Sequence, residues 1–358
     1  MKRLPLAAAL AAFFVLLLWS VSVRQAVLFL VGIGFGAALA GARFGFTTGW
    51  RRLVEQRDPR GVYGQLLLLA LAASLAMPLL GRFGELQAAL GPPSVSLLVG
   101  AFVFGLAMQV ADGCGSGTLY KAGLGVPLNM AILPLFALGS FLGSVQVQDW
   151  LVLGQVQPVG LVQAWGAGPA LAATLLALLA IAGAVRLWVG PDRPLFEKRW
   201  VWGAVALAVL ATLNLVVAGQ PWGIVYGFGL WAAKGAHALG LFDPAQNAFW
   251  SAAGNADRLA QSALLDVTSI TNIGLLGGAL WVSARKPGEA KQLRAAQWAV
   301  GLVAGFVMGY SSRLAFGCNV GAMFSGITTG SLHGWIWMPM AFMGTLLGLR
   351  LRRRIGFA

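Results

Sequence analysis

The chain is poor in cysteine, histidine and acidic residues. Its 358 residues include two Cys, two His and 11 Asp or Glu, and only 10% of the residues are charged. Two cysteines cannot build the disulfide framework of a small secreted domain, so we interpret both as free thiols. The Cys and His residues match no zinc-ligand spacing, and the chain has no GxxxxGKS or GxxxxGKT phosphate-binding loop. We therefore predict no metal site, no P-loop ATPase and no cofactor.

Long apolar runs dominate the chain instead. Hydrophobic residues make up 58% of it, and the mean hydropathy of +0.78 is not that of a soluble globular domain. A bilayer-spanning helix needs about 20 apolar residues, and the 49 glycines suit close packing of such helices. We predict an all-α polytopic membrane protein, embedded in the lipid bilayer, with roughly 9–13 helices including short re-entrant or half-helices.

The apolar segments divide into two sets by length. The longer segments lie near 4–23, 26–42, 63–80, 95–111, 127–146, 168–189, 200–218, 222–240, 267–284, 296–312 and 335–350. The shorter or glycine-rich pieces, which suit half-helices, lie near 44–50, 115–125, 150–162, 245–265 and 316–331. We interpret residues 1–358 as a single transmembrane domain with approximate halves 1–190 and 191–358. No small-residue cleavage motif follows 4–23, so we expect a retained first helix.

The net charge of +14 is concentrated in a few segments. Basic clusters occupy 51–60, 186–199, 284–294 and 349–354, whereas 147–167 contains no Lys or Arg. The positive-inside rule predicts that the four basic segments and both chain termini, including Lys2 and Arg3, are cytoplasmic. The helix at 95–111 then runs from outside to inside, and the helix at 296–312 runs from inside to outside.

These two oppositely directed helices lead into similar motifs. The first motif is GAFVFGLAMQVADGCGSGTLYKAG at 100–123, and the second is GLVAGFVMGYSSRLAFGCNVGAMFSG at 301–326. A weaker relative at 32–50 has Gly45 near the cysteine position, and a fourth at 223–240 has no thiol. Similar motifs entered from opposite membrane faces predict two inverted-topology repeats.

Both cysteines fall at these helix-breaking, glycine-flanked positions. A single buried Cys is most simply an inert small residue, but the equivalent placement of Cys114 and Cys318 favours a role in function. Glycine lets a ligand approach the backbone closely, and the amide groups at a helix start favour an anion. The predicted substrate-binding positions in these motifs are Cys114, Cys318, Gly113, Gly115, Ser116, Gly117, Gly317, Asn319 and Gly321.

Four basic residues lie near the breaks, where a charge in a membrane segment is costly and is therefore a functional candidate. Arg43 and Arg313, which precede FGFTT and LAFGCN, are the stronger candidates, and Lys121 and Lys234 are the others. Snorkelling of these side chains to the membrane surface is the alternative. The acidic residues Asp112 and Asp266 either pair with such cations or cap helices, and we expect capping.

The motifs DGCGSGTLYKAG at 112–123 and RLAFGCNVGAMFSGITTGSLHGW at 313–335 resemble those of the YeeE/YedE family of bacterial inner-membrane sulfur transporters. The resemblance covers most of the chain. It implies thiosulfate uptake through a central pathway with cysteines at a constriction, although some members are linked to selenium metabolism. It also implies a further cysteine in the first glycine-rich break, where this chain has Gly45.

We therefore predict transmembrane uptake of thiosulfate or a related small sulfur oxyanion, with the two thiols as a relay. The sulfonate end would bind amide and basic groups, and the terminal sulfur would contact the thiols as weak hydrogen-bond partners. A covalent persulfide is a second route. Other hypotheses are a membrane sulfurtransferase with Cys114 as nucleophile, a selenium-compound permease, and a membrane partner of a soluble sulfur carrier or rhodanese-like protein. We expect no catalytic residues of a true enzyme and no nucleic-acid partner.

Overall fold

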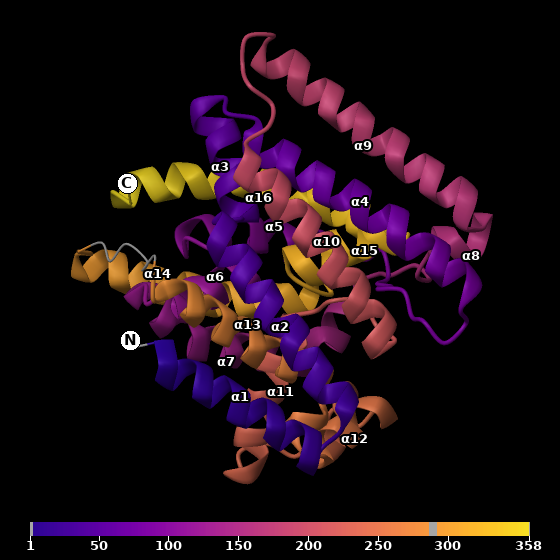
Figure 1. The fold of residues 1–358 in the computed structure, drawn as a ribbon, viewed down its shortest axis with the longest axis vertical. Helices are drawn as coiled ribbons and strands as arrows, with labels where there is room; N and C mark the ends of the chain where they lie inside the picture. The colour runs from indigo at the N-terminus through magenta and orange to yellow at the C-terminus, as the bar shows by residue number, and fades with distance from the viewer. Residues whose placement is uncertain (1–2, 286–291, 358) are drawn as a thin grey trace.

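The structure, a computed structural model, is a bundle of helices (Figure 1). It describes residues 3–285 and 292–357, so the predicted cytoplasmic Lys2 and residues 286–291 of the basic segment 284–294 lie outside the described residues. Within the described ranges the chain forms helices and two isolated bridges but no β-strand. The predicted all-α architecture is confirmed.

Eight apolar stretches of helix are long enough to cross a membrane, which confirms a multi-pass membrane protein. They comprise α1 (Arg3–Ser20), α2 (Val23–Ala42) with α3 (Phe46–Gln56), α4 (Arg60–Arg82), α5 (Val95–Val110) with α6 (Gly115–Gly123), α7 (Pro127–Val152), α9 (Ala167–Val189), α10 (Lys198–Ala218), and α14 (Ala295–Leu314) with the segments that follow it. The remaining long helices are α13 (Val267–Ser283) and α16 (Leu332–Ile355), whose last turn holds three arginines.

Four helices are followed by a break and then by a short helix. The short helices are α3, α6, α11 (Val225–Ala238), and the π-helical turn η3 (Asn319–Phe324) continued by α15 (Ser325–Thr328). The predicted segment 222–240 is thus a 14-residue half-helix, because Gly223 and Ile224 precede a helix that ends at Ala238. The 245–265 segment contains η1 (Pro244–Gln246), α12 (Ala253–Ala260) and η2 (Ala263–Leu265).

Three of the four breaks share one backbone turn. Each has a left-handed residue two positions before the residue that caps the short helix. The left-handed residues are Arg43 with φ 47°, Asp112 with φ 56° and Phe316 with φ 57°. The capping positions that follow them are Gly45, Cys114 and Cys318. Cys114 and Cys318 also have closely matching angles, with φ of −80° and −86° and ψ of −172° and −168°.

Helices of one half pack against helices of the other. α2 lies against α13, α10 against α4, α5 against α16, and α14 against α7. The glycines make this contact close: a methyl group at Gly36 would overlap the Leu275 carbonyl, and one at Gly278 would overlap the Ile33 carbonyl. Without a hydrophobic driving force in lipid, such small-residue contacts are a main source of helix association.

The basic segments gather at one end of the bundle. Arg60 of α4 pairs with Asp58 at 2.8 Å and Glu197 at 3.8 Å, and Arg353 of α16 pairs with Glu55 of α3 at 3.9 Å. The hydrogen bond from Arg60 holds the pKa of Asp58 below its ordinary value. The start of α1 and the end of α16 both lie on the left of Figure 1.

The opposite end of the bundle contains the loop within residues 147–167, a segment that has no Lys or Arg. Leu161 of α8 (Leu161–Trp165) donates its amide to the Gly330 carbonyl at 2.6 Å, and Leu332 donates to Val159 at 3.0 Å. α9 packs mainly on α4 and lies along the edge of the bundle in Figure 1. α5 therefore ends at the basic end, where α14 begins, and the two helices run in the opposite directions that the charge pattern predicts.

Candidate functional site

Cys114 caps the half-helix α6. Its sulfur accepts the backbone N–H of Gly117 at 3.4 Å and lies 3.5 Å from the hydroxyl of Ser116. The residue is 1% exposed, so the thiol is enclosed by protein. Gly117 sits close to this sulfur, because a Cβ at Gly117 would lie 3.4 Å from it. The predicted group of Cys114, Ser116 and Gly117 therefore forms one local site.

Cys318 meets this first break from the other half of the chain. A Cβ placed on Gly115 would lie only 3.0 Å from the Cys318 sulfur and 3.5 Å from the side chain of Ile224. Cys318 is fully buried and its sulfur makes no capping hydrogen bond. The absence of a side chain at Gly115 is thus what lets the two Gly–Cys breaks touch in the buried interior.

The remaining glycines of the motifs differ in whether their backbone and surroundings would accept a side chain. Gly317 has φ 147°, a conformation that other residues rarely adopt, and its Cβ would lie 2.6 Å from the Ala322 amide nitrogen. A Cβ on Gly113 would lie 2.9 Å from the Thr118 amide nitrogen. Gly321 has no neighbour within 4 Å of a Cβ position, so the space beside it is open.

Several buried polar groups near the breaks have no hydrogen-bond partner. Both the amide nitrogen and the amide oxygen of Asn319 lack one, although the side chain is fully buried. The buried hydroxyl of Thr118 and the buried indole N–H of Trp222 also lack a hydrogen-bond partner. A buried polar group without a partner is costly, and one explanation is a ligand that satisfies it.

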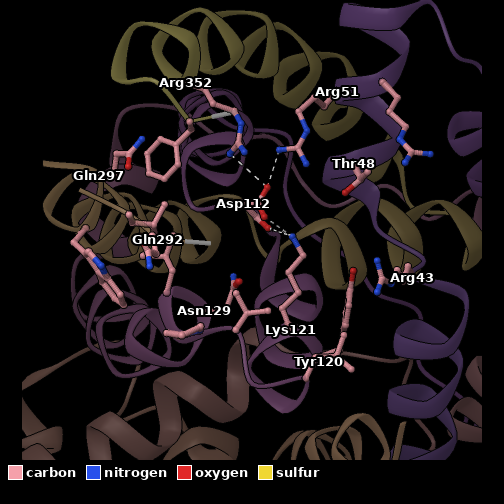
Figure 2. A pocket seen from close by; sticks show the side chains of 18 of the residues that line it. Arg43, Thr48, Arg51, Asp112, Tyr120, Lys121, Asn129, Gln292, Gln297 and Arg352 are labelled. Carbon is pink, nitrogen blue, oxygen red and sulfur yellow. Dashed lines mark hydrogen bonds and ion pairs between the residues drawn. The ribbon is translucent and has the colours of Figure 1, made fainter. Parts of the chain in front are cut away.

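A basic cavity of about 510 Å³ opens at the end of the bundle that holds the basic segments. Six cationic side chains line it, from α3, α6, α10 and α16 and the turn after α2: Arg43, Arg51, Arg52, Lys121, Arg199 and Arg352. Asp112 is the one carboxylate among the described residues of its lining. Figure 2 shows Asp112 at the centre of this cavity with Arg51, Lys121 and Arg352 directed toward it.

Asp112 binds cations and does not cap a helix, so the expectation of capping is wrong for this residue. Its carboxylate lies 2.7 Å from Arg51, 2.7 Å from Lys121 and 3.4 Å from Arg352. The physical reason is the position of Cys114, which occupies the capping position of α6 and leaves Asp112 on the preceding turn. The expectation of capping is confirmed for Asp266, which accepts the Ser269 N–H at 2.7 Å.

Only two of the four basic residues chosen from the sequence line one cavity. Arg43 and Lys121 line the cavity, whereas the guanidinium of Arg313 lies 4.8 Å from the Phe249 ring and 5.4 Å from the Tyr226 ring. Arg313 is inside α14, five residues before Cys318, and Arg43 is two residues before Gly45. The two arginines are therefore not at equivalent positions. Lys234 donates to the carbonyls of Leu259 and Gln261.

Sequence reasoning missed Arg51, Arg352 and Trp222. The first two were assigned to cytoplasmic segments, but α3 begins at Phe46, so that Arg51 points into the cavity, and α16 continues to Ile355. Trp222 is fully buried and stacks on Phe35 with ring centres 3.9 Å apart. Its place two residues before Ile224, at the start of the fourth half-helix, is the signal that could have found it.

The thiols are separated from the cavity. Neither cysteine is among the described residues that line it, although Asp112 and Tyr120, which precede and follow Cys114 in the chain, both line it. Across the described ranges, no three His, Cys, Asp or Glu side chains come together as a metal site requires. The site therefore contains a positively charged cavity, neutral hydrogen-bond donors, and two buried thiols at the starts of short helices.

Broken helices that start near the centre of a multi-pass bundle, with charged and polar groups directed inward, define a membrane transporter. Residues 41–347 match the family described as Sulphur transport, so the chain belongs to this family. The resemblance to YeeE/YedE sulfur transporters is thereby confirmed.

Three relatives with names extend the comparison. The thiosulfate transporter TsuA of Spirochaeta thermophila is 27% identical over 348 residues, which are 90% of this chain and 98% of that protein. The Probable transporter YedE of Escherichia coli is 28% identical over 153 residues, 41% of this chain and 36% of that protein. Its namesake from Salmonella typhimurium is 27% identical over 169 residues, 43% and 40% of the two chains. All three are named as transporters, which agrees with the prediction of a transporter rather than an enzyme.

Proposed function

We propose that this protein takes up thiosulfate, or a closely similar small sulfur oxyanion, across the bacterial inner membrane. The relative named as a thiosulfate transporter is similar over nearly its whole length, which supports this substrate class. In this proposal the basic end of the bundle, with both described chain ends, is cytoplasmic, because Lys and Arg accumulate on that side of membrane proteins.

The contact between Gly115 and Cys318 is the observation that carries the proposal. It brings the two Gly–Cys breaks together inside the bundle, and we propose that the translocation pathway passes between them. The terminal sulfur of the anion would contact one thiol and then the other, and the weak hydrogen bonds of a thiol suit a site that must also release its ligand. The unpartnered amide of Asn319 would donate to the sulfonate oxygens.

The two halves act as inverted repeats in this proposal. α2 packs on α13 as α10 packs on α4, and α5 packs on α16 as α14 packs on α7. The half-helices α3 and α6 return to the basic end, whereas α15 leads to Gly330 at the opposite end. A pseudo-two-fold relation of this kind would let one half rock against the other around the central thiols.

Gly45 at the third equivalent break is compatible with a two-thiol relay. Its φ of −138° is ordinary, and a Cβ there would have its nearest neighbour, the Thr48 hydroxyl, at 3.4 Å. We expect Gly45→Cys to fold and to place a thiol beside Tyr120 without loss of uptake. A soluble sulfur carrier that consumes the incoming anion would dock at the basic end.

The proposal is tested by uptake of radiolabelled thiosulfate into proteoliposomes. We expect Cys114→Ala and Cys318→Ala each to lower uptake by more than tenfold, while Ser74→Ala on the exposed face of α4 leaves it unchanged. Unlabelled sulfite, sulfate and selenite, added as competitors, define the substrate. Normal uptake in both cysteine variants would exclude the relay.

The same preparation in detergent separates transport from sulfurtransferase activity. A transporter leaves thiosulfate intact when no membrane gradient is present. Release of sulfite by the detergent-solubilised protein, lost in Cys114→Ala, would instead indicate an enzyme.

A further inference from the structure

A buried Ser–His pair lies at the end of the bundle opposite the basic cavity. The Ser331 hydroxyl and the His333 Nδ1 are 2.6 Å apart, and both residues are at most 1% exposed. Ser331 is the N-cap residue of α16, yet its side chain makes no capping hydrogen bond there. The hydroxyl is therefore committed to the imidazole, an ionisable group that the proposed thiol pathway does not use.

The imidazole occupies a slot between two glycines. A Cβ on Gly91 would lie 3.0 Å from the Cδ2 of His333, and one on Gly326 would lie 2.9 Å from its Cε1. The Nε2 atom lies between these two carbons in the ring and has no hydrogen-bond partner among the described residues. The ring can therefore accept a proton without losing its bond to Ser331, because a hydroxyl can act as donor or acceptor.

The slot contains no acidic partner for a protonated imidazole. Apart from the charges at the basic end of α3 and α16, the ionisable residues on the loop and helices packed around the slot are Glu85, Tyr310, Arg313 and Cys318. Within the described ranges, none of these groups forms a hydrogen bond or an ion pair with His333. A proton on this imidazole is therefore costly until a negative charge arrives nearby.

The slot is connected to the Cys318 break through Gly91. The Cβ position of Gly91 that contacts His333 also lies 3.1 Å from the ring of Phe316. Phe316 is the left-handed residue two positions before Cys318, where the proposed function places the anion. An anion at this break would supply the negative charge that the slot lacks, so the proton and the anion would each favour binding of the other.

Uptake of a doubly negative anion needs a compensating cation. Such an anion enters the cell against an inside-negative membrane potential, and each negative charge adds to the cost. A proton that enters with the anion cancels part of this charge. The Ser–His pair lies beside the contact of Leu332 with Val159, at the end of the bundle that faces outside in the proposed orientation. External protons would therefore reach this pair first.

We propose that His333 binds a proton that is carried inward together with the sulfur anion. Ser331 holds the imidazole in place, and the anion at the Cys318 break stabilises its protonated form. When the anion moves on toward Cys114, the imidazolium loses its counter-charge and the proton follows the anion. The proposal rests on the proposed function, because it makes the proton the coupling ion of the same transport.

Thiosulfate uptake into proteoliposomes at different external pH tests the coupling. The imidazole gains its proton as the external pH falls, so uptake should rise about tenfold between about pH 7.5 and about pH 5.5 outside, with the interior held at about pH 7.5. A pH-sensitive dye trapped inside should report acidification during uptake. His333→Gln should abolish both the rise in uptake and the acidification.

His237→Gln is the matched control, since it makes the same substitution at the other histidine of the chain. His237 is exposed near the end of α11, and its Nδ1 lies 3.1 Å from the Phe242 carbonyl oxygen. This variant should keep the full response to pH. Loss of the response in both variants, or its retention in His333→Gln, would overturn the proposal.

Proton uptake by the protein in detergent separates this inference from the proposed function. In weak buffer at about pH 6.5, thiosulfate should draw protons from solution into the unchanged protein and His237→Gln but not into His333→Gln. If this occurs and vesicles accumulate no thiosulfate, the transport proposal fails and the proton site stands. If thiosulfate accumulates without proton movement, or in response to a sodium gradient alone, the proton site is wrong and the transport function stands.

Ser331→Ala provides a second test, which holds even if His333→Gln does not fold. It keeps the imidazole and removes the hydroxyl that binds Nδ1. A hydrogen bond from the charged imidazolium is stronger than one to the neutral ring, so its loss should shift the rise in uptake to lower pH by about one unit. An unchanged pH response in folded Ser331→Ala would overturn the site.

Discussion

The two Gly–Cys breaks have nearly the same backbone but different surroundings. Cys114 accepts an amide hydrogen bond from Gly117 and follows a turn whose Asp112 contacts three of the six cations that line the basic cavity. Cys318 makes no capping bond and is followed by Asn319, whose buried amide has no partner. The shared backbone turn therefore positions a thiol in each break. The neighbouring side chains decide whether charged groups or neutral hydrogen-bond donors lie near that thiol.

The largest expected difference between the breaks concerns their first glycines. Gly317→Ala forces a side chain into φ 147° and to within 2.6 Å of a backbone nitrogen, so we expect a loss of about 2–4 kcal/mol in the free energy of unfolding. Gly113→Ala brings its Cβ to 2.9 Å from a backbone nitrogen without a left-handed backbone, and about 1–2 kcal/mol should be lost.

Denaturant titration in detergent checks both values. Gly41→Ala in α2, whose Cβ position has no neighbour within 4 Å, is the control and should be neutral or slightly stabilising. Equal losses for Gly113 and Gly317 would contradict the difference between the two turns.

A smaller difference should appear when each thiol is replaced in two ways. Cys114→Ser keeps an acceptor for the Gly117 N–H, whereas Cys114→Ala removes it. The Ala variant should therefore be less stable to unfolding than the Ser variant by about 1 kcal/mol. At Cys318, which makes no such bond, the two variants should differ by less. Thermal unfolding of the four variants, compared in pairs, measures these differences. A larger gap at Cys318 than at Cys114 would refute the assignment of the cap.

The smallest expected effect on stability is at Asn319. Removing a buried polar group that has no partner relieves its desolvation cost, so Asn319→Leu should leave the free energy of unfolding unchanged or raise it by about 1 kcal/mol. Uptake should nevertheless fall if the amide contacts the anion. Ser116→Ala, which removes a group bonded to Cys114, is the comparison in the first break. A loss of stability with uptake preserved would indicate a purely structural Asn319.

Much of the fold could be predicted because each long apolar run can satisfy its backbone only as a helix. Positions 100–123 and 301–326 were paired by their glycines and cysteines, and the structure has matching turns there. The segment at 222–240 was not recognised as a half-helix, because Gly223 and Ile224 give no strong breaking signal in an apolar run.

The site was predicted only in part. The sequence indicated Cys114, Cys318 and their glycines, since rare residues at repeated positions are visible without coordinates. It favoured Arg43 and Arg313 as the stronger basic candidates, but Arg43 lines the basic cavity and Arg313 lies over aromatic rings. The distance of a residue from a motif along the sequence does not reveal where its side chain points, because successive residues of a helix are rotated by about 100°.

The sequence by itself determined that the chain is a helical membrane protein and which two breaks contain thiols. These properties depend on local composition and on the cost of unpaired backbone groups in lipid. Only the tertiary structure decided that Cys318 touches Gly115 and that Arg51, Lys121 and Arg352 surround Asp112. These contacts join residues up to 240 positions apart, and their formation depends on the close packing that glycine allows between helices of the two halves.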